Sequence, residues 1–270
     1  MINIIKKIIE MFKIFFVGNL KSLLASNNKD LLKKNQQLLN IYNGKRIFIF
    51  FTGTSIRDVN FSDFKNEHVM GVNFLALHHK FKDLDADFYC FTPNWDASWS
   101  KLMAWGLAEI YEGLNSKAKL FLSASSHYWI NNFDYFGILD GNKKFKNNTY
   151  FISNKAFILN GGSNVNCNVP KSMHGVLSRS IGIAIDMGFK DIYLVGADYS
   201  KDPLRVGHFY GSTDFITSRS EEEVIINNQI MKFAKEKNVK IINVIDEGFT
   251  SPIYEGISQS KLAKILQKQS

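Results

Sequence analysis

The segment from Met187 to Tyr199 constrains the fold more than any other part of this 270-residue chain. A helical pattern of apolar residues ends at Gly188, and a short apolar strand then runs from Ile192 to Val195. Gly-Ala-Asp-Tyr follows directly and places polar side chains at the carboxyl end of this strand. Ligands of open α/β sheets bind at that edge. The segment therefore predicts a helix–strand unit of an α/β fold and one border of a candidate site.

Other short apolar runs along the chain have the length and the bounding polar residues of buried strands. Most are separated by enough residues for a crossover helix, which indicates a mostly parallel sheet covered on both faces. The sequence thus predicts an α/β, Rossmann-like, doubly wound fold. The expected strands are Arg46–Thr52, His68–Asn73, Asp87–Thr92, Ala118–Ser123, Asp191–Val195 and Lys240–Val244, and the expected helices are Met173–Met187 and Ser220–Glu236.

The composition is that of a globular protein, with 45% hydrophobic and 21% charged residues. We expect a basic amphipathic helix and linker over residues 1–43 and one main domain over residues 44–270. The two cysteines, Cys90 and Cys167, lie far apart and outside any metal-binding spacing. Neither a disulfide framework nor a zinc site is therefore expected, and a reducing cytoplasm is the natural compartment.

The net charge of +8 belongs almost entirely to the N-terminal segment, because residues 1–46 hold nine Lys and Arg against two acidic residues. A basic nucleic-acid groove on the main domain is therefore not expected. Apolar residues from Ile4 to Phe16 recur at helical spacing, with Lys6, Lys7 and Lys13 on the other side. This pattern favours a helix lying in a membrane interface. Packing against the domain or a partner chain, and a true membrane span, remain alternatives.

The first expected strand leads into a turn of small hydroxyl residues, Thr52-Gly53-Thr54-Ser55. A Rossmann-like fold places its nucleotide-binding loop at this position. Gly53 would permit close backbone approach, and the hydroxyl groups could bind ribose or phosphate oxygens. The turn is neither a dinucleotide fingerprint nor a P-loop, so a plain strand-to-helix turn is the alternative.

The order of these features resembles the bacterial family 42 sialyltransferases and the related MptE-like domains, which resemble 6-hydroxymethylpterin diphosphokinase. The resemblance spans Arg46 to Val244 and is strongest over Gly188–Asp198. The Gly-Asn-Gly-Pro-Ser-Leu loop of that superfamily falls on Phe51–Ile56, where only Gly53 and Ser55 are retained and Thr52 replaces the asparagine.

The resemblance also implies roles for residues farther along the chain. Asn73 matches an asparagine that contacts the nucleotide, and Asp198 matches the aspartate that closes the Gly-x-Asp turn. His208, in Val-Gly-His, matches the histidine taken as general base. Tyr199 and Tyr210 are candidates for the tyrosines that stabilise the leaving phosphate.

The chemistry agrees with these roles, since transfer to a hydroxyl group needs a base and an imidazole suits this at neutral pH. The start of the expected helix Met173–Met187 could dock a substrate carboxylate or phosphate. Trp95, Trp99 and Trp105 could serve as core or lid packing or as a platform for sugars. No metal ligands or cofactors are expected. The remaining candidate binding residues are Thr92, Asn94, Lys171, Ser172, His174 and Gly175.

These observations predict an inverting, metal-independent glycosyltransferase on the inner face of the bacterial cytoplasmic membrane. Its donor would be a nucleotide-activated sugar, first of all a CMP-linked acidic sugar, and its acceptor a glycan or lipid-linked glycan of the cell surface, such as lipopolysaccharide or capsule. A homo-oligomer is possible. One alternative is pyrophosphate transfer from ATP with Mg²⁺, as in the pterin diphosphokinases, and another is a non-catalytic nucleotide- or glycan-binding module.

Overall fold

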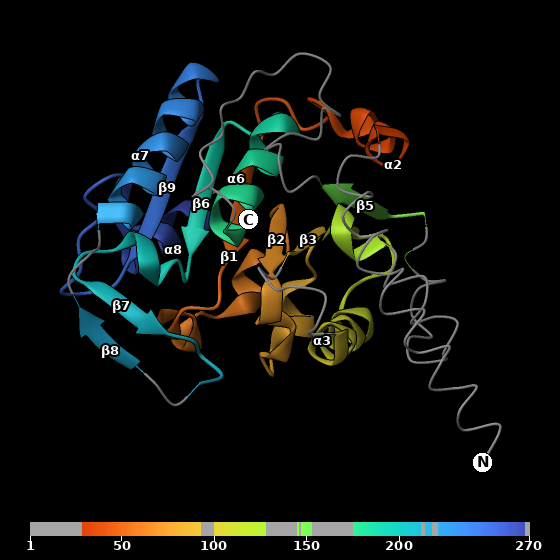
Figure 1. The fold of residues 1–270 in the computed structure, drawn as a ribbon. Helices are drawn as coiled ribbons and strands as arrows, with labels where there is room; N and C mark the ends of the chain where they lie inside the picture. The colour runs from red at the N-terminus through yellow and green to blue at the C-terminus, as the bar shows by residue number, and fades with distance from the viewer. Residues whose placement is uncertain are drawn as a thin grey trace.

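A computed structural model describes residues 29–92, 100–127, 145, 147–152, 175–211, 214–217 and 221–267. Its centre is an eight-stranded, wholly parallel sheet (Figure 1). The strands are β1 (Arg46–Phe50), β2 (Val69–Val72), β3 (Phe88–Phe91), β4 (Lys119–Ser123), β5 (Thr149–Ile152), β6 (Asp191–Val195), β9 (Lys240–Ile245) and β10 (Glu255–Ser258).

The strand order is β10-β9-β6-β1-β2-β3-β4-β5. The chain builds one half of the sheet from β1 outward to β5 and then returns to place β6 on the other side of β1. The carboxyl ends of β1 and β6 therefore flank the topological switch point, where a crevice opens in sheets of this kind. A separate hairpin of β7 (Leu204–Gly207) and β8 (Asp214–Thr217) follows β6.

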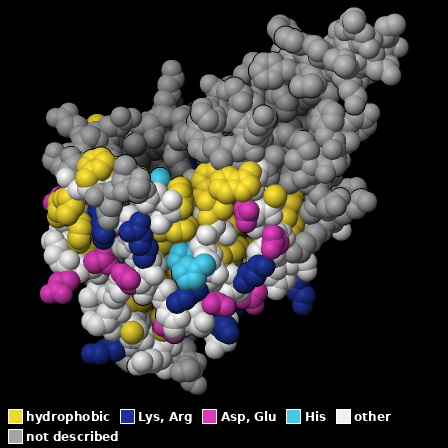
Figure 2. Space-filling view, turned by 90° about the horizontal axis from the view of Figure 1, so that it is seen from below, with side chains coloured by type: hydrophobic (Ala, Val, Ile, Leu, Met, Phe, Trp, Pro, Cys, Tyr) yellow, Lys and Arg dark blue, Asp and Glu magenta, His cyan; other side chains and the backbone are white. Residues whose placement is uncertain are grey.

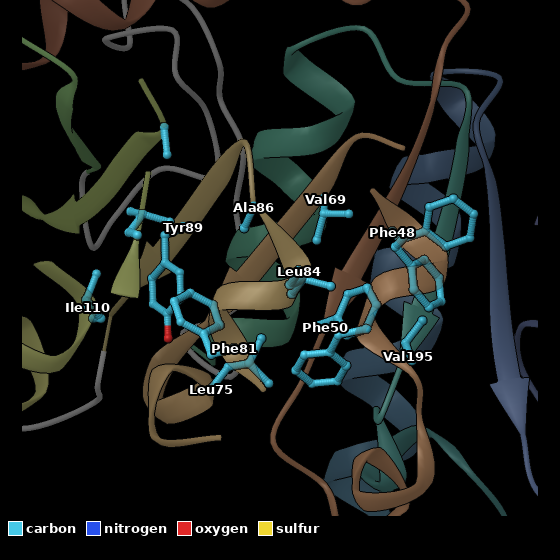
Figure 3. Close-up of a cluster of buried hydrophobic side chains, with 14 of the residues drawn as sticks. Phe48, Phe50, Val69, Leu75, Phe81, Leu84, Ala86, Tyr89, Ile110 and Val195 are labelled. Atoms are coloured by element: carbon cyan, nitrogen blue, oxygen red, sulfur yellow. The ribbon is translucent and has the colours of Figure 1, made fainter. Parts of the chain in front are cut away.

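Alternation along β1 divides its apolar side chains between the two faces of the sheet, because successive strand residues point in opposite directions. Phe48 and Phe50 join one buried cluster, and Ile47 and Ile49 join the other. Figure 3 shows part of the cluster that contains Phe48 and Phe50.

Helices cover both faces of the sheet, as a doubly wound fold requires. Leu107 of α3 and Leu262 of α8 pack in the cluster of Phe48, whereas Ile181 of α6 and Ile230 of α7 pack in the cluster of Ile47. The α-helices within the described residues are α2 (Lys29–Lys33), α3 (Ser100–Gly113), α6 (Val176–Asp186), α7 (Glu221–Glu236) and α8 (Gln259–Gln267).

The predicted fold class and the six predicted strands are confirmed, with boundaries shifted by one or two residues at most ends. The two predicted helices appear as α6 and α7. Strands β5 and β10 and the β7–β8 hairpin were not predicted. The crossovers from β1 to β2 and from β2 to β3 consist of short 3₁₀ helices, at Thr54–Asp58, Phe61–Phe64, Asn73–Leu77 and Phe81–Leu84.

Residues 29–43, which the sequence analysis placed in the linker, pack on the sheet domain. The Asn35 side chain is fully buried and donates a hydrogen bond to the Phe151 carbonyl at 2.7 Å. The Tyr42 ring stacks on Phe189 at a centroid distance of 4.9 Å. The expected amphipathic helix lies outside the described residues. Within them, no helix is both long enough and apolar enough to cross a bilayer.

Candidate active site

The turns after β1 and β6 touch at the switch point. The Gly53 amide donates to the Gly196 carbonyl at 3.0 Å, which continues the pairing of the two strands. A Cβ atom at Gly53 would lie 2.5 Å from both the Asp198 carboxylate and the Gly196 carbonyl oxygen. Glycine is therefore required at this position because the turn after β1 lies directly against the turn after β6.

Asp198 is fully buried beneath these turns. Its carboxylate accepts hydrogen bonds from the Ser55 amide at 3.0 Å and the Thr54 hydroxyl at 3.3 Å, and also one from the Ser55 hydroxyl. Burial by itself would raise the pKa of Asp198, but the Lys201 ammonium and the hydrogen bonds of Ser55 hold that pKa below its usual value. The sequence analysis placed Asp198, Thr54 and Ser55 in the candidate site. In the structure their polar side-chain groups bind one another and fix the turn.

Lys201 and Asp246 complete this buried network, and the sequence analysis missed both. The Lys201 ammonium lies 2.9 Å from the Asp198 carboxylate and 2.8 Å from that of Asp246, and it donates to the Ser55 hydroxyl at 3.0 Å. Asp246 directly follows β9, the neighbour of β6. One cation thus joins the ends of three adjacent strands, β1, β6 and β9.

His208 follows strand β7 and lies against the β1 turn. Its Nδ1 atom is 2.9 Å from the Thr52 hydroxyl. The next residue secures this position, because the Phe209 amide donates to the Thr52 carbonyl at 3.0 Å and the Arg57 guanidinium donates to the Phe209 carbonyl at 3.2 Å. Thr52 therefore holds the histidine through both its side chain and its main chain.

Tyr199 and Tyr210 gather around this histidine. The Tyr210 ring stacks on His208 at 5.0 Å and 10°, and the Tyr199 centroid lies 6.2 Å away. Burial lowers the pKa of His208, against smaller opposing effects of Thr52 and Asp198. Burial likewise raises the pKa of Tyr210 to about 12. At neutral pH the site therefore combines a neutral imidazole with a protonated phenol, and the three predicted catalytic residues do lie together.

Asn73 and Thr92 lie at the neighbouring strand ends, after β2 and β3. Asn73 has a positive φ of 46°, and its side-chain oxygen accepts a hydrogen bond from the Thr92 amide at 3.4 Å. The Phe74 ring meets the Tyr210 ring at a centroid distance of 5.9 Å. Phe74 thus connects this second group of predicted residues to the one around His208.

Arg179 is a further candidate that the sequence analysis missed. It lies in the first half of α6. Gly175 is the amino cap of this helix and has no side chain to bind the free amides. The residue is only 9% exposed, and burial lowers the pKa of its guanidinium. The Cys90 thiol acts weakly against this shift, and no carboxylate among the described residues pairs with the guanidinium. A buried cation is costly without a counterion, and the described residues supply none, which points to an anionic ligand.

The remaining predicted site residues, Asn94, Lys171, Ser172 and His174, lie outside the described residues. The same holds for Trp95 and Trp99, whereas Trp105 lies on α3. Within the described residues, no group of three or more His, Cys, Asp or Glu side chains gathers as a metal site would.

Several solved structures have folds similar to this chain. One is the MAf glycosyltransferase of Magnetospirillum magneticum AMB-1, with a TM-score of 0.48 and 15% identity, which matches over 89% of this chain but only 40% of its own length. The Campylobacter jejuni sialyltransferase CstII with cytidine-5'-monophosphate gives a TM-score of 0.41 at 15% identity, over 74% of this chain and 80% of its own. The sialyltransferase Cst-II with a trisaccharide acceptor and CMP gives a TM-score of 0.37, with the same identity and coverage as CstII with cytidine-5'-monophosphate.

At this identity the similarity concerns the fold. No protein-family model matches the sequence, and comparison with curated proteins gives no significant match.

Proposed function

We propose that this protein is a glycosyltransferase that uses a nucleotide-activated sugar, with His208 as its general base. The observation that carries the proposal is the position of His208 at the switch point of the sheet, held by Thr52 and flanked by two partly exposed tyrosines. A doubly wound sheet binds its ligands at this point.

The protonation state of His208 suits such a role. Burial keeps the imidazole neutral at pH 7, so one ring nitrogen carries a lone pair. If Nδ1–H donates to the Thr52 hydroxyl, the lone pair is on Nε2. In the proposed reaction an acceptor hydroxyl oxygen attacks the anomeric carbon and gives its proton to this nitrogen, while the bond from the anomeric carbon to the phosphate oxygen breaks. Inversion follows from a single displacement of this kind.

The leaving group carries negative charge, which must be stabilised as it develops. The phenol groups of Tyr199 and Tyr210 are partly exposed beside His208 and can donate hydrogen bonds to a phosphate. We propose that they bind the departing nucleotide phosphate.

Arg179 and the amino end of α6 supply a second anion-binding element, because helix amino ends attract negative charge. We propose that they bind an anionic group of the donor, and that Asn73 and Thr92 line the nucleotide next to them. We propose an acidic sugar linked to CMP as this donor.

A thermal-shift screen with CMP, UDP, GDP and ATP, each with and without Mg²⁺, tests the proposal. A ligand that binds only the native state raises the melting temperature. We expect CMP to raise it without Mg²⁺, and the variant Arg179→Gln to reduce the shift. Stabilisation by ATP only in the presence of Mg²⁺ would support pyrophosphate transfer, and stabilisation by none of the four nucleotides would contradict the proposal.

A further inference from the structure

A series of aromatic rings in contact runs from His208 to helix α3. Beyond the stack of His208 on Tyr210, the Phe74 ring meets Tyr210 at 5.9 Å and 77°. The Trp105 ring then stacks on Phe74 at 6.0 Å and 26°. We call these four residues the aromatic row. It joins three segments that are distant in sequence: the segment after β2, helix α3 and the segment after β7.

The members of the aromatic row differ in exposure. Phe74 is only 8% exposed and packs at right angles against Phe91, so it is anchored in the core. Trp105 and Tyr210 both contact its ring and are 46% and 43% exposed. The hairpin and α3 lie at the lower end of the molecule in Figure 1, and the view from below in Figure 2 shows hydrophobic side chains gathered on this face.

Local packing fixes the position of Trp105. The adjacent Gly106 lies so close to the core that a Cβ there would come within 2.9 Å of both the Phe91 and Phe74 rings. Helix α3 can therefore approach the sheet edge at this point, which presses Trp105 against Phe74. The indole is held in place on its inner side and remains exposed on its outer side, unlike a core residue.

The chemistry of such a surface fits a carbohydrate. An aromatic face is electron-rich, and one face of a sugar ring presents weakly positive C–H groups. The two faces therefore stack, while the sugar hydroxyl groups stay hydrated. Sites for small organic ligands combine aromatic walls with a few polar groups in the same way. The aromatic row ends at the candidate base, to which an acceptor hydroxyl must come.

We infer that Trp105 is a sugar-stacking subsite for the acceptor, which is an oligosaccharide of at least two sugars. The sugar that reacts lies at His208, and a sugar farther along the acceptor stacks on Trp105. This inference rests on the proposed function and adds the class of acceptor to it.

Fluorescently labelled lactose, cellobiose, chitobiose and maltose provide the test, with binding measured by fluorescence anisotropy. We expect the wild type to bind at least one of them at millimolar concentration or below. Trp105→Ala should weaken that binding by about threefold to tenfold, the worth of one aromatic contact. Trp105→Phe should retain most of it. Phe215→Ala, which removes a 54%-exposed ring on β8 outside the aromatic row, should change nothing.

Three results would overturn the inference: no binding of any of the four disaccharides by the wild type, equal binding by Trp105→Ala, or an equal loss in Phe215→Ala. The same proteins are tested for a thermal shift with CMP, which Trp105→Ala should leave unchanged. A CMP shift without disaccharide binding would reject the Trp105 subsite and leave the proposed transferase function standing. If CMP does not raise the melting temperature of the wild type, the proposed function itself is contradicted.

Discussion

At residue scale, Gly53 shows how little space separates the two turns of the candidate site. A Cβ atom there would overlap the Asp198 carboxylate. We expect Gly53→Ser to lower the free energy of unfolding by about 1–3 kcal/mol, the usual cost of overpacking. Urea denaturation measures this. Gly175→Ser is the matched control, since its new side chain meets nothing within 4 Å and serine is favoured at a helix amino cap. Equal stability of the two variants would show that the turns are not in contact.

His208 gives a prediction for pH. Because burial lowers the pKa of the folded-state imidazole, the neutral base persists below the usual value of 6.5. We expect the acid limb of the kcat/KM profile to lie below pH 6.5. The free energy of unfolding should follow the same pH dependence. Because the unfolded imidazole takes up a proton more readily than the folded one, this contribution is present at higher pH and is lost as the pH falls below 6.5. An acid limb at or above pH 6.5 would contradict the assignment of His208 as a base that burial keeps neutral.

At element scale, the Lys201 ammonium connects the ends of β1, β6 and β9 through Ser55, Asp198 and Asp246. Lys201→Met would leave the buried Asp198 carboxylate without its cation, at a cost of about 3–5 kcal/mol in unfolding free energy. Lys82→Met is the control, because the Lys82–Glu112 pair is exposed and such pairs contribute at most about 1 kcal/mol. Chemical denaturation of both variants gives the comparison. A loss no larger than that of the control would show that the network is not structurally important.

The same elements show how far sequence reasoning reaches. The apolar runs Arg46–Thr52 and Asp191–Val195 predicted strands, because each is short, bounded by polar or turn residues and buried along its length. Strand β5 was not among the predicted runs, although at four residues it is as long as β2 and β3. The ion pair of Lys201 with Asp246 depends on β9 lying next to β6, and no local sequence pattern predicts that strand order. Arg179 did have a signal, as the one charged residue among Val176–Ile185.

At the scale of the whole molecule, four lysines, Lys6, Lys7, Lys13 and Lys21, precede the described domain. We expect residues 1–26 to attach the protein to anionic membranes, since their apolar and lysine side chains segregate at helical spacing. Deletion of residues 1–26 removes none of the residues from Lys29 onward that pack on the sheet. The truncated protein should fold and should no longer sediment with anionic vesicles. The wild type should be released by salt. Unchanged sedimentation, or an unfolded truncation, would contradict this expectation.

The central claim is that His208 is the base of a glycosyl-transfer site, and nucleotide release tests it most directly. Single-turnover release of CMP from a CMP-linked acidic sugar is measured with disaccharide acceptors, for the wild type and for His208→Ala. Loss of the base should slow release by about 10²–10⁴-fold. The thermal shift with CMP should stay nearly the same, because the imidazole acts on the acceptor. Equal release by both proteins, or an equal loss of release and of CMP binding in the variant, would contradict the claim.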